Sequence, residues 1–378
     1  MKNNKHLAIL QKALNEECLS RKEIACLLAS CPGPETDALF KAARQLRKKY
    51  FNNDIFLYGF VYNSTHCRNN CRFCYYRKDN THSPRYSKSR AQILDISCKL
   101  AESGVHLIDL TMGESVLLHN DMAEQVQTLC EIISDIKNQT HLPVMISPGV
   151  LPDWALKRMA DAGADFYACY QETHNPDLFS QLRIGQSFSE RFLVKQNAAR
   201  NNLLIEEGIL CGVGETSEDI MDSFDAMKRL DVDQTRVMGF VPQTGTPMEN
   251  HPLADIKMEL IILAVLRLLF PDRLIPASLD VEGVNGLEKR LYAGANVVTS
   301  IVPAGEGLAG VAQNTLDIED ARRTVAQVEK ILSSCGDYEI ARPEVYKAWI
   351  LQRKNDQKNK RGENNLNSSV PLQTLKAI

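Results

Sequence analysis

Eight short apolar segments, alternating with polar or amphipathic stretches, most limit how this chain can fold. We expect strands at residues 55–63, 106–113, 144–149, 166–173, 204–213, 234–242, 273–280 and 296–303. Stretches with helical periodicity, such as 89–104, 152–163 and 255–270, lie between them. Strands that alternate with helices predict a parallel sheet, and eight such units predict a closed (β/α)8 TIM-type barrel. An open doubly wound sheet is the alternative.

The chain has 378 residues, which is enough for a barrel of about 250 residues with extensions at both ends. We predict N-terminal helices over residues 1–50 that pack on the barrel, and the barrel itself over 51–353. Residues 354–378 are rich in Asn and Lys and offer few apolar side chains for burial. We therefore predict a disordered C-terminal tail there.

Composition and charge exclude several classes of protein. The net charge is −3 and the chain has no basic stripe, so nucleic-acid binding is not expected. The N-terminus does not read as a signal peptide, and the longest apolar run, 260–270, is too short to span a membrane. Eleven scattered cysteines do not form a secreted disulfide framework. We expect a cytoplasmic protein without a membrane partner.

Three cysteines form a dense cluster directly after the first predicted strand. Cys67, Cys71 and Cys74 have the spacing Cys-x3-Cys-x2-Cys in "HCRNNCRFCYYR". Thiolates are soft ligands that hold iron–sulfur clusters, and three of them leave one iron of a [4Fe–4S] cluster open. The alternative is a zinc-stabilised binding protein with His66 as the fourth ligand. His66 adjoins Cys67, which makes a tetrahedral arrangement awkward.

Polar residues interrupt the apolar segments close to their carboxyl ends. They are Asn63, Asp109, Thr111, Glu114, Ser147, Glu172, Arg236, Ser278 and Asp280. In a parallel barrel these ends meet at the face where active sites form. Any one of these residues could instead cap a helix or pair with a neighbour. Together they predict a polar mouth that also contains the cysteine cluster.

The cysteine cluster, with Phe73 before its third cysteine, resembles the signature of the radical S-adenosylmethionine (SAM) superfamily. "MGE" (112–114) is similar to the Gly-Gly-Glu element of that family, with Met112 in place of the first Gly, and "GILCGVGE" (208–215) is similar to its adenine-side element. The resemblance implies a [4Fe–4S] cluster, SAM on the open iron, and a one-electron donor such as flavodoxin or ferredoxin. The SAM-binding residues that it implies are Phe73, Met112, Gly113, Glu114, Ser147, Glu172, Arg183, Arg191 and Gly212.

Residues 170–192 resemble a segment shared by the biotin synthase, hydrogenase-maturase and methylornithine synthase branches. Further segments between residues 20 and 345 resemble the methylornithine synthase family specifically. This implies isomerisation of L-lysine to (3R)-3-methyl-D-ornithine in pyrrolysine biosynthesis. A 5′-deoxyadenosyl radical would start fragmentation of lysine, and recombination of the fragments would give the product.

The same resemblance implies four substrate-binding residues, Asp109, Arg236, Ser278 and Asp280. An Arg suits the lysine carboxylate, and the two Asp residues suit its ammonium groups. Mutual pairing of these charges without substrate is the competing interpretation. The runner-up function is another enzyme of the same branch. Sulfur insertion would need further clustered cysteines, but Cys169 and Cys211 are single and are not expected at the mouth.

Overall fold

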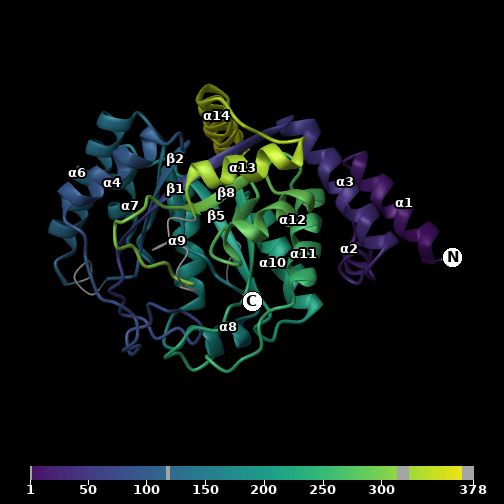
Figure 1. Ribbon diagram of the computed structural model, residues 1–378, viewed down its shortest axis with the longest axis horizontal. Helices are drawn as coiled ribbons and strands as arrows, with labels where there is room; N and C mark the ends of the chain where they lie inside the picture. The colour runs from purple at the N-terminus through teal and green to yellow at the C-terminus, as the bar shows by residue number, and fades with distance from the viewer. Residues whose placement is uncertain (1, 116–119, 313–322, 368–378) are drawn as a thin grey trace.

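The computed structural model describes residues 2–115, 120–312 and 323–367. Eight parallel strands form a nearly closed barrel at its centre (Figure 1). They are β1 (Asp54–Ser64), β2 (Leu107–Met112), β3 (Val144–Ser147), β4 (Phe166–Ala168), β5 (Leu204–Cys211), β6 (Gln234–Gly239), β7 (Pro276–Ser278) and β8 (Val297–Ile301). Each expected segment overlaps one strand, and the predicted barrel is confirmed, although most strands are shorter than expected and β4 and β7 have only three residues each.

The barrel closes between β6 and β7 through only a short stretch of backbone. Apart from this closure, neighbouring strands are paired in the order β6-β5-β4-β3-β2-β1-β8-β7. At the closure, the Thr235 amide donates to the Leu274 carbonyl (3.0 Å), and the Leu274 amide donates to the Asp233 carbonyl (3.1 Å). These residues lie at the start of β6 and just before β7, so the amino-terminal ends of the two strands hold the barrel together.

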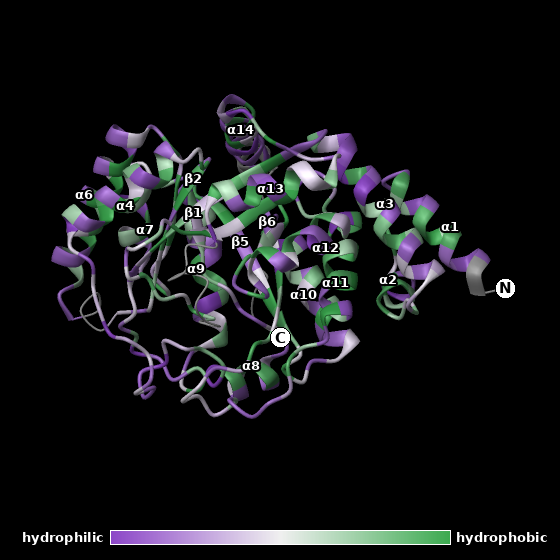
Figure 2. Cartoon of the chain, viewed as in Figure 1, coloured by the Kyte–Doolittle hydropathy of each residue, from purple (hydrophilic) through white to green (hydrophobic). Residues whose placement is uncertain are grey.

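Helices surround the strands, as the alternating sequence pattern predicts. They are α4 (Arg90–Glu102), α6 (Met122–Thr140), α7 (Asp153–Asp161), α8 (Pro176–Leu182), α9 (Phe188–Arg200), α10 (Ser217–Leu230), α11 (Ile256–Leu269), the short 3₁₀ helix η1 (Gly283–Gly286) and α12 (Leu287–Tyr292). Capping boxes at Ser89 and Thr216 fix where α4 and α10 begin. Figure 2 shows both hydrophobic and hydrophilic residues along the outer helices. No helix in the described part of the chain is long and apolar enough to cross a membrane.

Three N-terminal helices, α1 (Lys2–Leu14), α2 (Arg21–Leu28) and α3 (Pro34–Phe51), lie beside α11 on one side of the barrel (Figure 1). Leu39 and Leu46 of α3 are buried. Arg21 of α2 forms ion pairs with Asp222 (2.9 Å) and Asp225 (2.5 Å) of α10. Apolar burial and surface ion pairs thus attach this extension to the outside of the barrel.

The chain ends in α13 (Val325–Cys335), β9 (Glu339–Ile340) and the long helix α14 (Pro343–Asn367). The prediction of a disordered tail from residue 354 is wrong as far as Asn367. Tyr346 is fully buried on the barrel, and Lys354 bonds to Asp165 (2.6 Å), so α14 has partners that the local composition did not reveal. The remainder of the expected tail, 368–378, lies outside the described residues.

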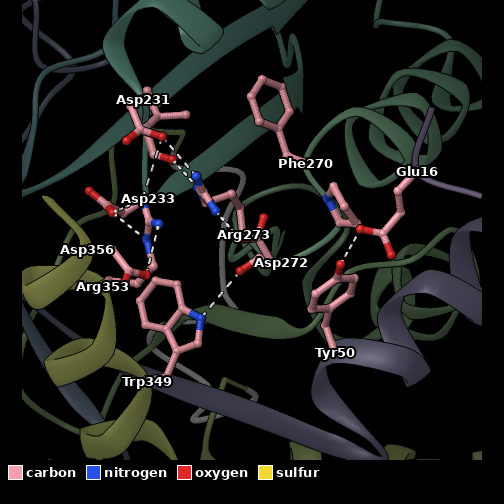
Figure 3. A network of polar contacts seen from close by, with 12 residues as sticks. Glu16, Tyr50, Asp231, Asp233, Phe270, Asp272, Arg273, Trp349, Arg353 and Asp356 are labelled. Atoms are coloured by element: carbon pink, nitrogen blue, oxygen red, sulfur yellow. Dashed lines mark hydrogen bonds and ion pairs between the residues drawn. The ribbon is translucent and has the colours of Figure 1, made fainter. Parts of the chain in front are cut away.

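Helix α14 lies across the amino-terminal ends of the strands, at the top of Figure 1, opposite the loops that follow the strands. Figure 3 shows the polar network beneath it. Asp233 accepts hydrogen bonds from the Ile205 amide (2.8 Å), Arg353 Nε (2.9 Å) and Gln357 Nε2 (2.7 Å). The network closes this end of the barrel, so the opposite end is the accessible one.

Candidate active site

A single cavity lies at the carboxyl-terminal ends of the strands and brings most of the predicted site residues together. Its lining includes Cys67, Cys71, Phe73, Cys74, Asp109, Met112, Gly113, Glu114, Ser147, Glu172, Arg183, Arg191, Arg236 and Asp280. Three predicted residues, the strand-end residue Asn63 together with Gly212 and Ser278, lie outside this lining. Gly212 forms a tight turn against Ala254, where an added Cβ would lie 2.6 Å from the Ala254 Cβ, and Ser278 lies behind Asp280.

The cysteine loop follows β1 and holds its three free thiols at one wall of the cavity. Burial, and then repulsion from Cys71 and Cys67, raises the pKa of Cys74 well above its ordinary value. Arg183 Nη1 (3.5 Å) and Gln186 Nε2 (3.0 Å) donate to the Cys71 sulfur. Thiolates at this wall therefore need a cationic centre, and the wall already supplies hydrogen-bond donors.

The arrangement of these thiols bears on the choice between a cluster and zinc. Among the described residues, no group of three or more His, Cys, Asp or Glu side chains is placed to hold a single metal ion. A zinc site requires all ligands within about 2.3 Å of one ion, whereas each thiolate of a [4Fe–4S] cluster binds a different iron. The cysteine loop contributes three thiols to the cavity lining and no fourth. This number fits a [4Fe–4S] cluster with one open iron.

Glu114 is held firmly beside the cysteine loop. Its Oε1 accepts hydrogen bonds from Arg68 Nε (2.8 Å) and Nη2 (2.6 Å), and its Oε2 accepts one from Asn69 Nδ2 (3.0 Å). Burial alone would raise its pKa, but Arg191 and Arg68 outweigh burial and lower it. Gly113 is required here because a Cβ would lie 2.4 Å from the His66 carbonyl oxygen. The "MGE" motif (112–114) and the cysteine loop thus pack directly against each other.

Glu172 is placed by an unusual backbone conformation just beyond β4. Its φ is 68°, a left-handed value that is uncommon for a residue other than glycine. The Glu172 amide donates to the Gly208 carbonyl (3.2 Å), and its own carbonyl accepts from the Leu210 amide (3.0 Å). These bonds to β5 hold the strained residue and form an isolated parallel bridge beyond the end of β4 at Ala168.

The Glu172 carboxylate pairs with Arg183 Nη2 at 2.7 Å. Burial raises the pKa of Glu172 despite this partner. Arg183 also lies over the Phe73 ring, with 5.3 Å from its guanidinium carbon to the ring centre. Arg183 therefore joins Glu172, from the same segment 170–192, to Phe73 of the cysteine loop.

The predicted substrate anchor Arg236 already has a charged partner. Its Nε donates to Glu206 Oε1 (2.7 Å) and its Nη1 donates to Thr299 Oγ1 (3.2 Å). Its Nη2 is buried and has no hydrogen-bond partner among the residues that the structure describes. Arg236 thus pairs with Glu206 and not with the predicted carboxylates Asp109 or Asp280, and a donor remains open on the other side of the guanidinium.

The two predicted ammonium-binding carboxylates differ in their surroundings. Asp109 accepts a hydrogen bond from Thr111 Oγ1 (2.9 Å), and burial together with repulsion from Glu206 raises its pKa to about 8. Asp280 is closely surrounded by protein donors. Arg323 Nη1 (2.6 Å), Ser300 Oγ (2.7 Å) and Tyr62 Oη (3.2 Å) all bond to it.

Sequence reasoning missed the partners Glu206 and Arg323. Glu206 had a readable signal, because "LIEEGILC" places charges inside an apolar strand, the same pattern that identified Arg236. Arg323 had none, since it lies 43 positions from Asp280 and in no strand. Cys169 needs a correction, because it lines the cavity. The expectation that it lies away from the mouth was wrong: β4 ends at Ala168, and the strand alternation does not extend to it.

Comparison with known proteins agrees with this site. The Radical SAM superfamily profile matches residues 61–227. The 3-methylornithine synthase of Methanosarcina acetivorans is 43% identical over 318 residues, which cover 84% of this chain and 89% of that protein. The [FeFe] hydrogenase maturase subunit HydE of Thermotoga maritima is 30% identical over 265 residues, covering 69% of this chain and 74% of that protein.

A solved structure gives the same answer. The crystal structure of methylornithine synthase superposes with a TM-score of 0.85 at 39% identity, covering 90% of this chain and 99% of the other. The similarity extends over the barrel and most of its extensions, well beyond the cysteine motif. The chain therefore belongs to the 3-methylornithine synthase family within the radical SAM superfamily.

Proposed function

We propose that this chain isomerises L-lysine to (3R)-3-methyl-D-ornithine, with a [4Fe–4S] cluster and SAM as cofactors. When bound, these cofactors would supply the radical that removes a hydrogen atom from the substrate. Cys67, Cys71 and Cys74 would hold the cluster. Glu114, Glu172, Arg183 and Arg191 would hold the polar groups of SAM, because all four line the same cavity as the thiols.

The observation that carries the proposal is the balance of charge across the cavity from the cysteine loop. Fully ionised, Asp109, Glu206 and Asp280 supply three negative charges, and Arg236 and Arg323 supply two positive charges, a sum of −1. Lysine carries two ammonium groups and one carboxylate, a sum of +1. A lysine in this part of the cavity would neutralise the buried charges, and a neutral or anionic amino acid would not.

The arrangement also suits a reaction in which the substrate breaks into two pieces. Arg236 Nη2 would donate to the α-carboxylate, and Asp109 and Asp280 would accept from the ammonium groups. Anchors at both ends of lysine would keep the fragments together until they recombine at another carbon. Burial of Arg236 and Asp280 would exclude water from the reacting carbons.

Product analysis tests this proposal. Anaerobically reconstituted protein would be incubated with SAM, dithionite and each of L-lysine, D-lysine and ornithine, with mass spectrometry after chromatography. We expect a new compound with the mass of lysine from L-lysine alone. A product that has gained sulfur, or turnover of ornithine in preference to L-lysine, would contradict the proposal.

A further inference from the structure

Two adjacent buried glutamates on β5 point to opposite sides of the barrel wall. Glu206 contacts Arg236 on β6 and the Tyr170 hydroxyl (2.7 Å), both of which line the cavity. Glu207 accepts from the Gln171 amide (2.8 Å) and forms an ion pair with Lys195 of α9, on the outer side. Both carboxylates are fully buried. The two glutamates differ in whether their cationic partner keeps a buried donor without an acceptor.

Lys195, the cationic partner of Glu207, also donates to Gln171 Oε1 (2.9 Å), whereas Arg236, the cationic partner of Glu206, keeps a donor that no described residue accepts. Arg236 is 3% exposed, and its Nη2 has no partner in the described part of the chain. An unpaired buried N–H is unfavourable unless a ligand accepts a hydrogen bond from it. The cavity is the space that this guanidinium lines. The open Nη2 is therefore suited to an anionic group of a bound molecule.

The orientation of that donor is fixed from several directions. Glu206 Oε1 takes the Nε hydrogen, and the guanidinium carbon of Arg236 lies 5.5 Å from the centre of the Tyr170 ring. Gly208 leaves little free space there, because a Cβ would lie 3.0 Å from the Tyr170 ring and 3.4 Å from the Arg236 Cβ. The planar guanidinium can turn only if these contacts break.

We infer that Glu206, itself held by the Tyr170 hydroxyl, is a positioning residue that aims Arg236 Nη2 at the substrate carboxylate. The inference rests on the proposed function, since it takes Arg236 as the carboxylate anchor. Glu206 touches no substrate atom in this scheme. It also lies near Asp109, so it influences the charge of both the carboxylate-binding and the ammonium-binding parts of the cavity.

A comparison of two ligands tests the inference. Lysine and 1,5-diaminopentane differ only in the carboxylate, so only lysine depends on the orientation of Arg236. Affinities would be measured by anaerobic calorimetry on reconstituted protein with SAM and without reductant. For Glu206→Gln we expect lysine affinity to fall about 10-fold. Binding of 1,5-diaminopentane, which has no carboxylate to meet Arg236, should fall less than lysine binding.

Tyr170→Phe provides a second variant that keeps the buried ion pair intact and so protects the test if Glu206→Gln does not fold. We expect a loss of lysine affinity of about 3-fold, again with a smaller loss for 1,5-diaminopentane. Arg353→Gln, at the closed end of the barrel, is the matched control. It breaks a buried ion pair and should lower stability without separating the two ligands.

The outcomes distinguish the inference from the proposed function. Equal losses for both ligands, or no loss for lysine in either variant, would overturn the positioning role of Glu206 alone. If the unaltered protein binds no lysine, the proposed function fails, and the inference fails with it. A pH profile adds an independent readout, because loss of the Glu206 charge should shift the pH dependence of lysine binding toward lower pH.

Discussion

The two ends of the barrel treat buried charge in different ways, and strand β6 shows both. At its amino-terminal side, Asp233 accepts hydrogen bonds from a backbone amide, Arg353 and Gln357. Three residues later, Arg236 pairs with Glu206 but keeps a buried N–H that no described residue accepts. Under α14, Asp233 and Arg353 pair directly with each other at 2.8 Å (Figure 3). Buried charge at the closed end thus joins parts of the chain, and we propose that at the open end it prepares a binding site.

Removal of the proposed cluster ligands should give the largest effect, and that effect should be confined to the open end. Cys67→Ala, Cys71→Ala and Cys74→Ala should each abolish assembly of a [4Fe–4S] cluster and cleavage of SAM. The barrel core lies elsewhere, so far-ultraviolet circular dichroism should remain unchanged. Iron and sulfide analysis after anaerobic reconstitution checks this. Full iron content in any of the three variants would disprove its assignment as a ligand.

Disruption of the closed end should affect stability and leave function intact. Arg353→Ala leaves Asp233 buried without its cationic partner, which should cost about 3–5 kcal/mol of unfolding free energy. Urea unfolding measures this loss. Iron content and lysine affinity of the folded variant serve as controls and should match the unaltered protein. A variant with normal stability would show that α14 contributes little to closing the barrel.

Glu172→Gln should separate the proposed binding of SAM at the open end from assembly of the cluster. The charge that pairs with Arg183 is lost, so SAM affinity should fall about 10-fold while iron content is retained. Equilibrium binding of SAM to the reconstituted, unreduced protein is the measurement. An unchanged affinity would mean that Glu172 is only a structural partner of Arg183.

The raised pKa of Asp109, about 8, predicts that lysine binding depends on pH. In the empty protein the raised pKa favours the protonated form of Asp109. The stability that this form contributes is lost as the pH rises through 8. An ammonium group at Asp109 requires the charged form, so lysine binding must release the proton at lower pH. Thr111, Glu206, Arg236 and Asp280 are the groups that act on this carboxyl.

Lysine affinity should therefore rise about fivefold from pH 7 to pH 8 and level off above that. Calorimetry in buffers of different ionisation enthalpy would detect the released proton. Asp109→Asn should bind lysine more weakly and lose this pH dependence. If the dependence persists in Asp109→Asn, the titrating group is another residue.

The barrel was predictable because strand and helix periodicity are local properties of the sequence. The cysteine loop and the polar strand ends were predictable for a related reason, since parallel strands bring their carboxyl ends to one face. The contacts of α14 were not, because its residue Gln357 meets Asp233 across 124 positions of sequence. The Lys- and Asn-rich composition of this segment does not indicate that it has partners so far away in the sequence.

The ion pairs within the site also divide into what the sequence shows locally and what it does not. Each charged residue inside a strand was visible, but which charges pair was not. Arg236 could have paired with Asp109 or Asp280, and the structure pairs it with Glu206 on the neighbouring strand. The left-handed backbone of Glu172 was also invisible, because contacts with β5 impose it on a residue that does not favour it. Long-range pairing therefore decides which charges are free to bind substrate.

The most direct test of the difference between the two ends is the lysine affinity of Arg236→Lys, measured with SAM present and reductant absent. The substitution keeps the charge and removes the planar two-pronged donor. Lysine affinity should fall about 10- to 150-fold, with SAM affinity unchanged. Intact lysine binding combined with a lower melting temperature would contradict the account, because Arg236 would then be a structural ion-pair residue like Arg353.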